Sequence, residues 1–256
     1  MPPSFLNLPR ELRDTIYDAL WIATPRIRLL DHPSMGRIVA CYKSHLYPET
    51  ALPTWLLTNK QLLSEATAQM IRHGTWIVRL RSEYDEHRVG GVLSPLLARH
   101  LTVTLTHPLE GPRPRWPHVV QEATLRPSKE NTECLERVIS QVSRVSNVRD
   151  VRFILEQVRE EPFSRIDLST LEVASSLRPA LQRMEIVVVR EQVYRAYSAG
   201  FVEAVAAEVK RVGNKVMGSD EDPGMSDFIR ERGFVYVFEK PGEMGLCRVD
   251  SAVATG

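Results

Sequence analysis

The chain has 256 residues, of which 43% are hydrophobic and 25% are charged, and its formal net charge is +1. This length is sufficient to bury a substantial core in one large or two small domains. The near-neutral charge gives no electrostatic support for binding to nucleic acid or to an anionic membrane. No uninterrupted apolar run approaches the roughly 18 residues of a membrane span.

Cysteine usage and the N-terminal composition predict an intracellular location. Cys41, Cys134 and Cys247 lie far apart and form no paired spacing. Such a set suits a reducing compartment better than a secreted disulfide framework. The first residues also lack the basic and apolar regions of a signal peptide. We therefore expect the protein in the cytoplasm or the nucleus.

Residues 5 to 21, FLNLPRELRDTIYDALW, have the pattern of an amphipathic helix. Pro9 suits the first helical position, and Glu11 in the first turn faces the positive end of the helix dipole. Apolar residues recur on one side and charged residues on the other. The apolar side holds Leu12, Ile16, Tyr17, Leu20 and Trp21, and the charged side holds Arg10, Arg13, Asp14 and Asp18. Spacing alone favours a terminal helix that packs on the protein's own core.

The run Leu8-Pro9-x-Glu11-Leu12-x-x-x-Ile16 in this helix resembles the opening of the F-box, in the form found in short fungal F-box-like proteins. In that family the run packs on a Skp1-type adaptor protein. The resemblance therefore implies one set of partner-contacting positions. These are Leu8, Pro9, Leu12, Ile16 and Leu20.

A second helix is predicted over residues 54 to 73. It has two candidate starts, one at Pro53-Thr54 and one at Thr58, which has capping-box spacing with Gln61. Gly74 supplies the end. The segment LLTNKQLLSEA, residues 56 to 66, again resembles the fungal F-box-like group. The resemblance thus covers roughly residues 5 to 80.

The rest of the first half contains predicted strands and loops. Residues 26 to 30 predict a short strand, and residues 31 to 53 predict a loop around the apolar piece Ile38 to Tyr42. Residues 75 to 80 and 96 to 106 predict strands, the second with one buried face. The proline-rich stretch from 107 to 129 predicts a surface loop or linker.

The second half alternates helices and strands. Helices are predicted around 135–145, 168–181, 201–213 and 226–232, with Gly213 closing the third, and strands at 148–155, 184–189 and 234–238. This alternation predicts an α/β (or α+β) fold with a mainly parallel sheet covered by helices. The unequal strand intervals exclude a strict repeat array, so the sheet is expected to be only loosely solenoid-like. The resulting segments are 1–80 (F-box-like), 81–130 (connecting) and 131–256 (helix–strand).

No pattern in the sequence predicts catalysis or a metal site. There is no G-x-S-x-G serine elbow. Cys41, four residues before His45, and Cys134 are better explained as small buried hydrophobes. His100, His107 and His118 share a region but have no metal-ligand spacing. We therefore predict no cofactor and no enzyme activity.

Three further patterns do not meet the requirements of a binding site. Gly90-Gly91 lacks the remaining glycines and the lysine of a phosphate loop. The acidic loop from 218 to 224 lacks the fixed ligand positions and closing glutamate of an EF-hand. Arg113, Arg115 and Trp116 combine basic and stacking side chains, but three residues in a near-neutral chain give little support for nucleic-acid binding.

The resemblance implies an F-box-like adaptor that binds a Skp1-type partner and presents an unknown protein target to a cullin ubiquitin ligase. Loops on a rigid scaffold commonly carry binding residues, so the expected target-facing segments are Glu156 to Arg165 and Arg190 to Tyr197. The alternative is a non-catalytic protein–protein interaction domain, with the F-box-like helices packed in its own core and no ligase link. An enzyme of unrecognised type is a third hypothesis.

Overall fold

The structure is a computed structural model, which describes residues 5–32, 36–43, 49–80, 87–88, 97–105, 109–110, 123–145, 147–158, 163–190, 198–220, 223–226 and 233–240. The helices are η1 (Phe5–Asn7), α1 (Arg10–Ala23), η2 (Thr54–Leu57), α2 (Lys60–His73), α3 (Lys129–Ser143), η4 (Ser169–Leu177) and α4 (Ala199–Met217). The strands are β1 (Arg26–His32), β2 (Gly36–Tyr42), β3 (Glu49–Thr50), β4 (Gly74–Leu80), β5 (His87–Arg88), β6 (His100–Leu105), β7 (Leu109–Glu110), β8 (Ala123–Pro127), β9 (Asp150–Val158), β10 (Phe163–Ile166), β11 (Arg183–Arg190), β12 (Gly224–Ser226) and β13 (Gly233–Glu239).

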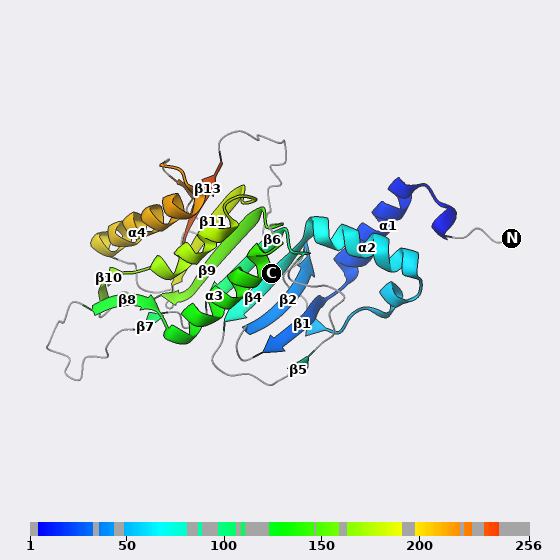
Figure 1. The fold of residues 1–256 in the computed structure, drawn as a ribbon, viewed down its shortest axis with the longest axis horizontal. Helices are drawn as coiled ribbons and strands as arrows, with labels where there is room; N and C mark the ends of the chain where they lie inside the picture. Colours follow the sequence, from blue (N-terminus) through cyan, green and yellow to red (C-terminus); the bar gives the residue numbers. More distant parts are fainter. Residues whose placement is uncertain are drawn as a thin grey trace.

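One mixed sheet runs through the described chain in the order β12-β13-β11-β9-β6-β4-β2-β1-β3, with β5 paired to β1 (Figure 1). The four central strands β4, β6, β9 and β11 are parallel, whereas β2, β13 and their outer neighbours β1 and β12 pair antiparallel. The fold is therefore mixed α/β, with a parallel centre in its sheet and one further parallel pair, β1 with β3, at the edge. A smaller sheet has the order β10-β8-β7.

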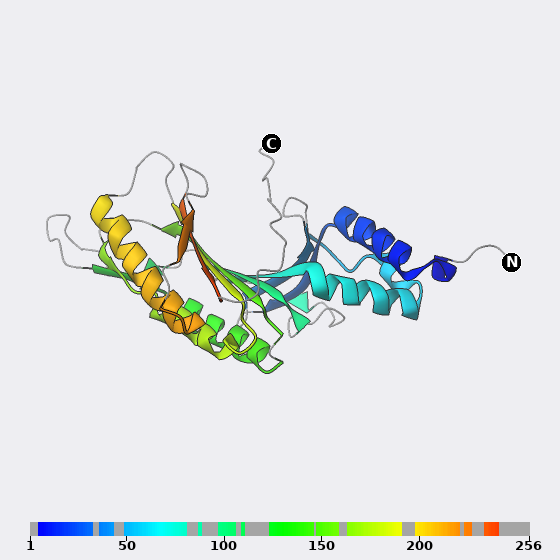
Figure 2. The same cartoon turned by 90° about the horizontal axis from the view of Figure 1, so that it is seen from above.

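Helices α3, η4 and α4 lie along one face of the sheet (Figure 2). Alternate strand residues point toward these helices and are fully buried, among them Val103, Phe153 and Ile186. Because the side chains of a strand alternate between faces, the residues between them point the other way. On that second face Arg152 and Glu185 form an ion pair at 3.2 Å and remain partly exposed. The helix-covered face therefore holds most of the core.

Helices α1 and α2 pack against each other and project from the end of the molecule that carries β1 and β2 (Figures 1 and 2). Gly74 ends α2 and begins β4 without an intervening loop. Buried residues form one continuous cluster from Trp21 of α1 to Phe238 of β13. The first two helices are thus tied to the sheet by shared core.

The prediction of a loop over residues 31 to 53 is wrong where the structure describes strands in that range, above all over residues 36 to 42. Residues 36 to 42 form β2, which pairs with both β1 and β4. Ile38, Val39 and Ala40 are all nearly inaccessible to solvent. A strand that is buried on both faces has a continuous apolar run rather than an alternating one. Here the prolines and the glycine around the short run favoured a loop, so the strand was missed.

Four other predicted elements differ from the structure, the last of them in its one described residue. Helix α2 begins after Asn59, whose side chain accepts a hydrogen bond from the backbone N–H of Gln61 at 2.7 Å. Of the two predicted starts, Pro53-Thr54 begins the separate 3-10 helix η2, and Thr58 is the C-cap of η2. The helix expected at 168–181 is the 3-10 helix η4. The proline-rich stretch from 107 to 129 contains β7 and β8. The predicted helix at 226–232 begins with Ser226, which belongs to β12, and its other residues lie outside the described ones.

Gly213 does not close the last helix, as was predicted. Helix α4 continues to Met217 and ends at Gly218, whose φ of 71° lies in the left-handed region that favours glycine. Gly213 is instead required for packing, since a Cβ atom there would lie 2.0 Å from Cζ of Phe238. Absence of a side chain at position 213 lets α4 lie directly on β13.

Candidate partner-binding helix

Helix α1 starts one residue later than the sequence predicts. Pro9 is the N-cap, with ψ of 149°, and Arg10 is the first helical residue. Proline suits this boundary because it has no N–H that would need a partner. Glu11 lies in the first turn as expected, where its negative charge faces the positive end of the helix dipole.

The side of α1 that faces the protein is aromatic. Tyr17 and Trp21 are 0% and 1% exposed. The ring of Phe5 packs edge-on against Tyr17, and the ring of Trp55 packs in the same way against Trp21 at 5.0 Å. Trp21 Nε1 donates a hydrogen bond of 2.9 Å to the backbone oxygen of Ala66. These contacts anchor α1 on α2 and on η2, the short helix that precedes α2.

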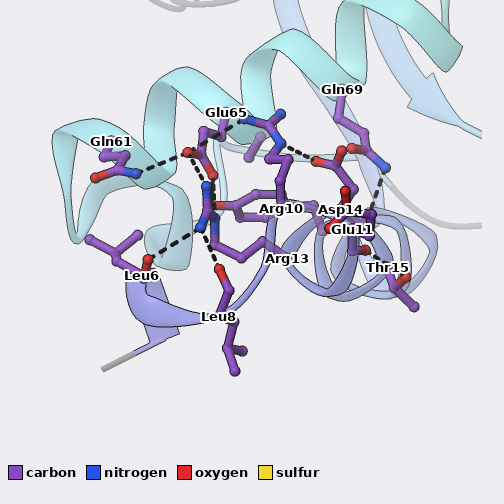
Figure 3. A network of polar contacts seen from close by, with 12 residues as sticks. Leu6, Leu8, Arg10, Glu11, Arg13, Asp14, Thr15, Gln61, Glu65 and Gln69 are labelled. Carbon is purple, nitrogen blue, oxygen red and sulfur yellow. Dashed lines mark hydrogen bonds and ion pairs between the residues drawn. The ribbon is translucent and has the colours of Figure 1, made fainter. Parts of the chain in front are cut away.

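A polar network joins α1 to α2 around Glu65 (Figure 3). Arg13 donates two hydrogen bonds of 2.9 Å to the two carboxylate oxygens of Glu65, and Tyr17 and Gln61 each donate one of 3.0 Å. Bidentate pairs of this kind are both strong and directional. Arg13 also donates to the backbone oxygen of Leu8 at 2.6 Å, so the same side chain fixes the chain that enters the helix.

The network shifts the pKa values of its members. The hydrogen bonds from Arg13 are the largest cause that lowers the pKa of Glu65 to about 2. Burial, followed by the hydrogen bond to Glu65, raises the pKa of Tyr17 to about 12. Glu65 is therefore ionised and Tyr17 protonated throughout the physiological range.

We expect Glu65→Gln to weaken the α1–α2 contact. Since the folded-state pKa is below the ordinary value of 4.5, the stabilisation by Glu65 is complete above pH 4.5 and is lost as the pH falls toward about 2. At pH 7 the substitution should cost roughly 1–2 kcal/mol. Urea unfolding followed by circular dichroism at pH 7 and at pH 3 measures both effects. An equal cost at the two pH values would contradict this assignment.

The opposite side of α1 is apolar and faces solvent. Leu12 is 52% exposed and Ile16 is 37% exposed, and Ala19 and Ala23 are exposed beside them. Positions 12, 16, 19 and 23 are spaced so that they form one stripe along a helix. Large apolar side chains together on a surface mark interaction sites more often than single ones do.

The structure divides the five positions that the resemblance assigns to partner contact. Leu12 and Ile16 lie in the exposed stripe, and Pro9 is exposed at the start of the helix. Leu8 and Leu20 are half-buried. Tyr17 and Trp21, which the sequence places beside the same stripe, are the residues that fill the protein's own core.

The two segments that carry the resemblance contact each other. Glu65 and Ala66, at the end of the LLTNKQLLSEA segment, are the acceptors for Arg13, Tyr17 and Trp21 of α1. Sequence reasoning did not pair these residues, because Arg13 and Glu65 are 52 positions apart. In the sequence Arg13 lies on the charged side of its predicted helix, so no local pattern indicated its contact with Glu65.

The cysteines behave as buried hydrophobes. Cys41 and Cys134 are thiols that no disulfide joins in the described chain, and they are 3% and 7% exposed. Burial raises the pKa of each thiol to about 11. Since the thiolate is the nucleophile, neither residue is a candidate for catalysis. His45 and Cys247 lie outside the described residues.

The remaining candidates from the sequence fall into two groups. His100 is the first residue of β6, within the strand predicted over residues 96 to 106. Within the described chain no cluster of three or more metal-ligating side chains occurs, and no helix there is long and apolar enough to cross a bilayer. The other candidate positions lie outside the described residues: Gly90, Gly91, His107, Arg113, Arg115, Trp116 and His118.

The two segments expected to face a target are largely not loops where the structure describes them. Residues 156–158 belong to β9 and residues 163–165 to β10, and Arg190 ends β11. Residues 159–162 and 191–197 lie outside the described residues. Comparison with known proteins adds no relative: no protein-family model matches the chain, and no curated protein and no solved structure matches it either.

Proposed function

We propose that this chain is an F-box-like adaptor, which binds a Skp1-type protein through the exposed stripe of α1 and presents a target protein to a cullin ubiquitin ligase. The observation that carries the proposal is the exposure of Leu12 and Ile16. These are two of the positions that the resemblance assigns to the partner, and an amphipathic helix that offers such a stripe suits a helix-in-groove contact.

The two-sided character of α1 supports the proposal further. The helix is held to the protein by Tyr17, Trp21 and the bonds from Arg13 to Glu65. Its apolar stripe is therefore available without detachment of the helix. A preformed rigid helix also loses less conformational entropy on binding than a segment that must fold.

In this proposal the chain itself performs no chemistry. It raises the local concentration of a target near the ubiquitin-charged enzyme, and proximity replaces intrinsic affinity. The target-binding part is the helix–strand region, where β9 and β11 lie side by side in the sheet in chain order. That order supports the loosely solenoid-like arrangement, which is part of the proposal. The proposal also includes a location in the cytoplasm or the nucleus.

The test is co-expression with a fungal Skp1, followed by size-exclusion chromatography and measurement of the dissociation constant. We expect Leu12→Asp with Ile16→Asp to weaken binding by about 100-fold or more, because buried apolar anchors at interfaces typically contribute about 2 kcal/mol each. Circular dichroism should show an unchanged fold, since both side chains face solvent.

Ile22→Asp is the control, because Ile22 is 43% exposed on the same helix but lies outside the stripe. It should bind Skp1 like the wild type. Equal loss of binding in Ile22→Asp and the double variant would contradict a specific contact. A soluble, folded wild type that never co-elutes with Skp1 would favour the alternative, in which α1 serves only the protein's own core within a protein–protein interaction domain.

A further inference from the structure

His100 lies where α2 and three parallel strands come together. As the first residue of β6, it stands beside Thr75 of β4 and Asp150 of β9 in the sheet. Its Nδ1 atom lies 2.5 Å from a carboxylate oxygen of Asp150. Its Nε2 atom lies 3.2 Å from the backbone oxygen of Arg72, in the last turn of α2. One ring therefore contacts the end of a helix and the start of a central strand.

Both partners of the ring are acceptors. An ionised carboxylate and a backbone carbonyl have no proton to donate, so each needs an N–H from the imidazole. Neutral histidine carries one N–H and can satisfy only one of them, whereas the imidazolium carries two and satisfies both. The carbonyl of Arg72 is also among the last four of α2, which lack partners within the helix and form the negative end of its dipole.

We propose that His100 is a pH-dependent tie, which joins the C-terminal end of α2 to β9 when its ring is protonated and releases one of these two contacts when the ring loses its proton. Helix α2 carries Glu65 and Ala66, which hold α1. The tie therefore acts where the pair of helices α1 and α2 joins the sheet. This inference concerns the coupling of that pair to the sheet and does not depend on the nature of any partner.

The charges around the ring favour its protonated form. The hydrogen bond that the ring donates to Asp150 is the largest cause that raises the pKa of His100; burial and the charge of Arg99 oppose the shift, and the carbonyl of Arg72 adds to it. His73, the last residue of α2, has its pKa lowered, chiefly by burial. The charged and titratable groups around His100 are Arg99, which precedes β6, Arg72 and His73 at the end of α2, and Asp150 of β9. In the sheet Arg183 of β11 lies beside Asp150, on the side away from His100.

The stabilisation by His100 should follow from the raised pKa. A group whose pKa is higher in the folded than in the unfolded state stabilises fully below the unfolded value, here about 6.5, and this stabilisation is lost as the pH rises through the folded value. His100→Gln should increase the unfolding equilibrium constant by a larger factor at pH 6 than at pH 9. We expect the two factors to differ about threefold or more.

The first measurement is urea unfolding of the wild type and His100→Gln at these two pH values, with His73→Gln alongside. Because the pKa of His73 is shifted in the opposite direction, His73→Gln should show the opposite trend with pH. All other histidines are shared by the compared proteins and cancel in the ratio. The proposal would be overturned if the unfolding constant of His100→Gln, divided by that of the wild type, were the same at pH 6 and at pH 9.

The second measurement needs no loss of the histidine. Titration of the His100 ring by NMR should give a midpoint above 6.5 in the wild type, and Asp150→Asn should lower that midpoint. Amide exchange in the last turn of α2, corrected for the intrinsic effect of pH, should be faster in His100→Gln than in the wild type at pH 6. An unchanged midpoint in Asp150→Asn, or equal exchange, would show that the ring does not tie α2 to β9.

Discussion

Replacement of Trp21 by alanine should destabilise the protein by about 4 kcal/mol, since truncation of a fully buried tryptophan leaves a large cavity. The side chain is 1% exposed, contacts Trp55 and Tyr42, and donates from Nε1 to the backbone oxygen of Ala66. Its loss therefore removes packing and a hydrogen bond together. Urea unfolding followed by far-ultraviolet circular dichroism measures the free energy of unfolding.

The neighbouring residue provides the comparison for this change. Ile22 follows Trp21 on the same helix but is 43% exposed, so Ile22→Ala should change the free energy of unfolding by less than about 0.5 kcal/mol. The difference between the two variants reports which side of α1 is buried. Similar costs for both would mean that α1 is not held by its aromatic side.

Gly213→Ala should destabilise the protein by about 3 kcal/mol, although alanine is the better helix former. The added Cβ atom would lie 2.0 Å from Cζ and 2.2 Å from one Cε atom of Phe238. Phe238 is itself 5% exposed, so its ring has little room to move, and overpacking of a core typically costs about 1–3 kcal/mol or more. Thermal or urea unfolding measures the cost.

The same substitution elsewhere in α4 should have the opposite sign. An added Cβ atom at Gly200 would meet nothing within 4 Å, so Gly200→Ala should stabilise by roughly 0.5 kcal/mol through helix propensity. Gly213→Ala combined with Phe238→Leu should recover part of the loss, because the smaller side chain gives the methyl group space. A neutral effect of Gly213→Ala alone would contradict the close approach of α4 and β13.

The order of most long elements could be predicted from hydrophobic periodicity. The first helix, the strand after Gly74 and the strand 234–238 all appear close to their expected bounds. Each has a strong local pattern, which depends on side-chain spacing rather than on distant contacts. The short apolar run of β2 was missed because a run of this length does not by itself distinguish a strand from a loop with a buried segment.

Strand direction and the burial of polar residues could not be predicted. The strand 234–238 was expected in a mainly parallel sheet, yet β13 pairs antiparallel with β11. Thr102 and Thr104 were expected on an exposed face, yet they are 8% and 4% exposed. Direction depends on the path of the chain between strands, and burial depends on which elements cover a face, so neither is encoded in the local pattern.

The sequence by itself determined that α1 is amphipathic, and the resemblance supplied an expectation of which of its positions contact a partner. Only the tertiary structure decided which apolar side chains of this wide stripe remain free. Tyr17 and Trp21 carry polar atoms that find Glu65 and the Ala66 carbonyl inside the protein, whereas Leu12 and Ile16 point away from α2 toward solvent. The physical reason is that burial favours the larger aromatic surfaces with satisfied hydrogen bonds, and the acceptors that satisfy them lie more than 40 residues away in the chain.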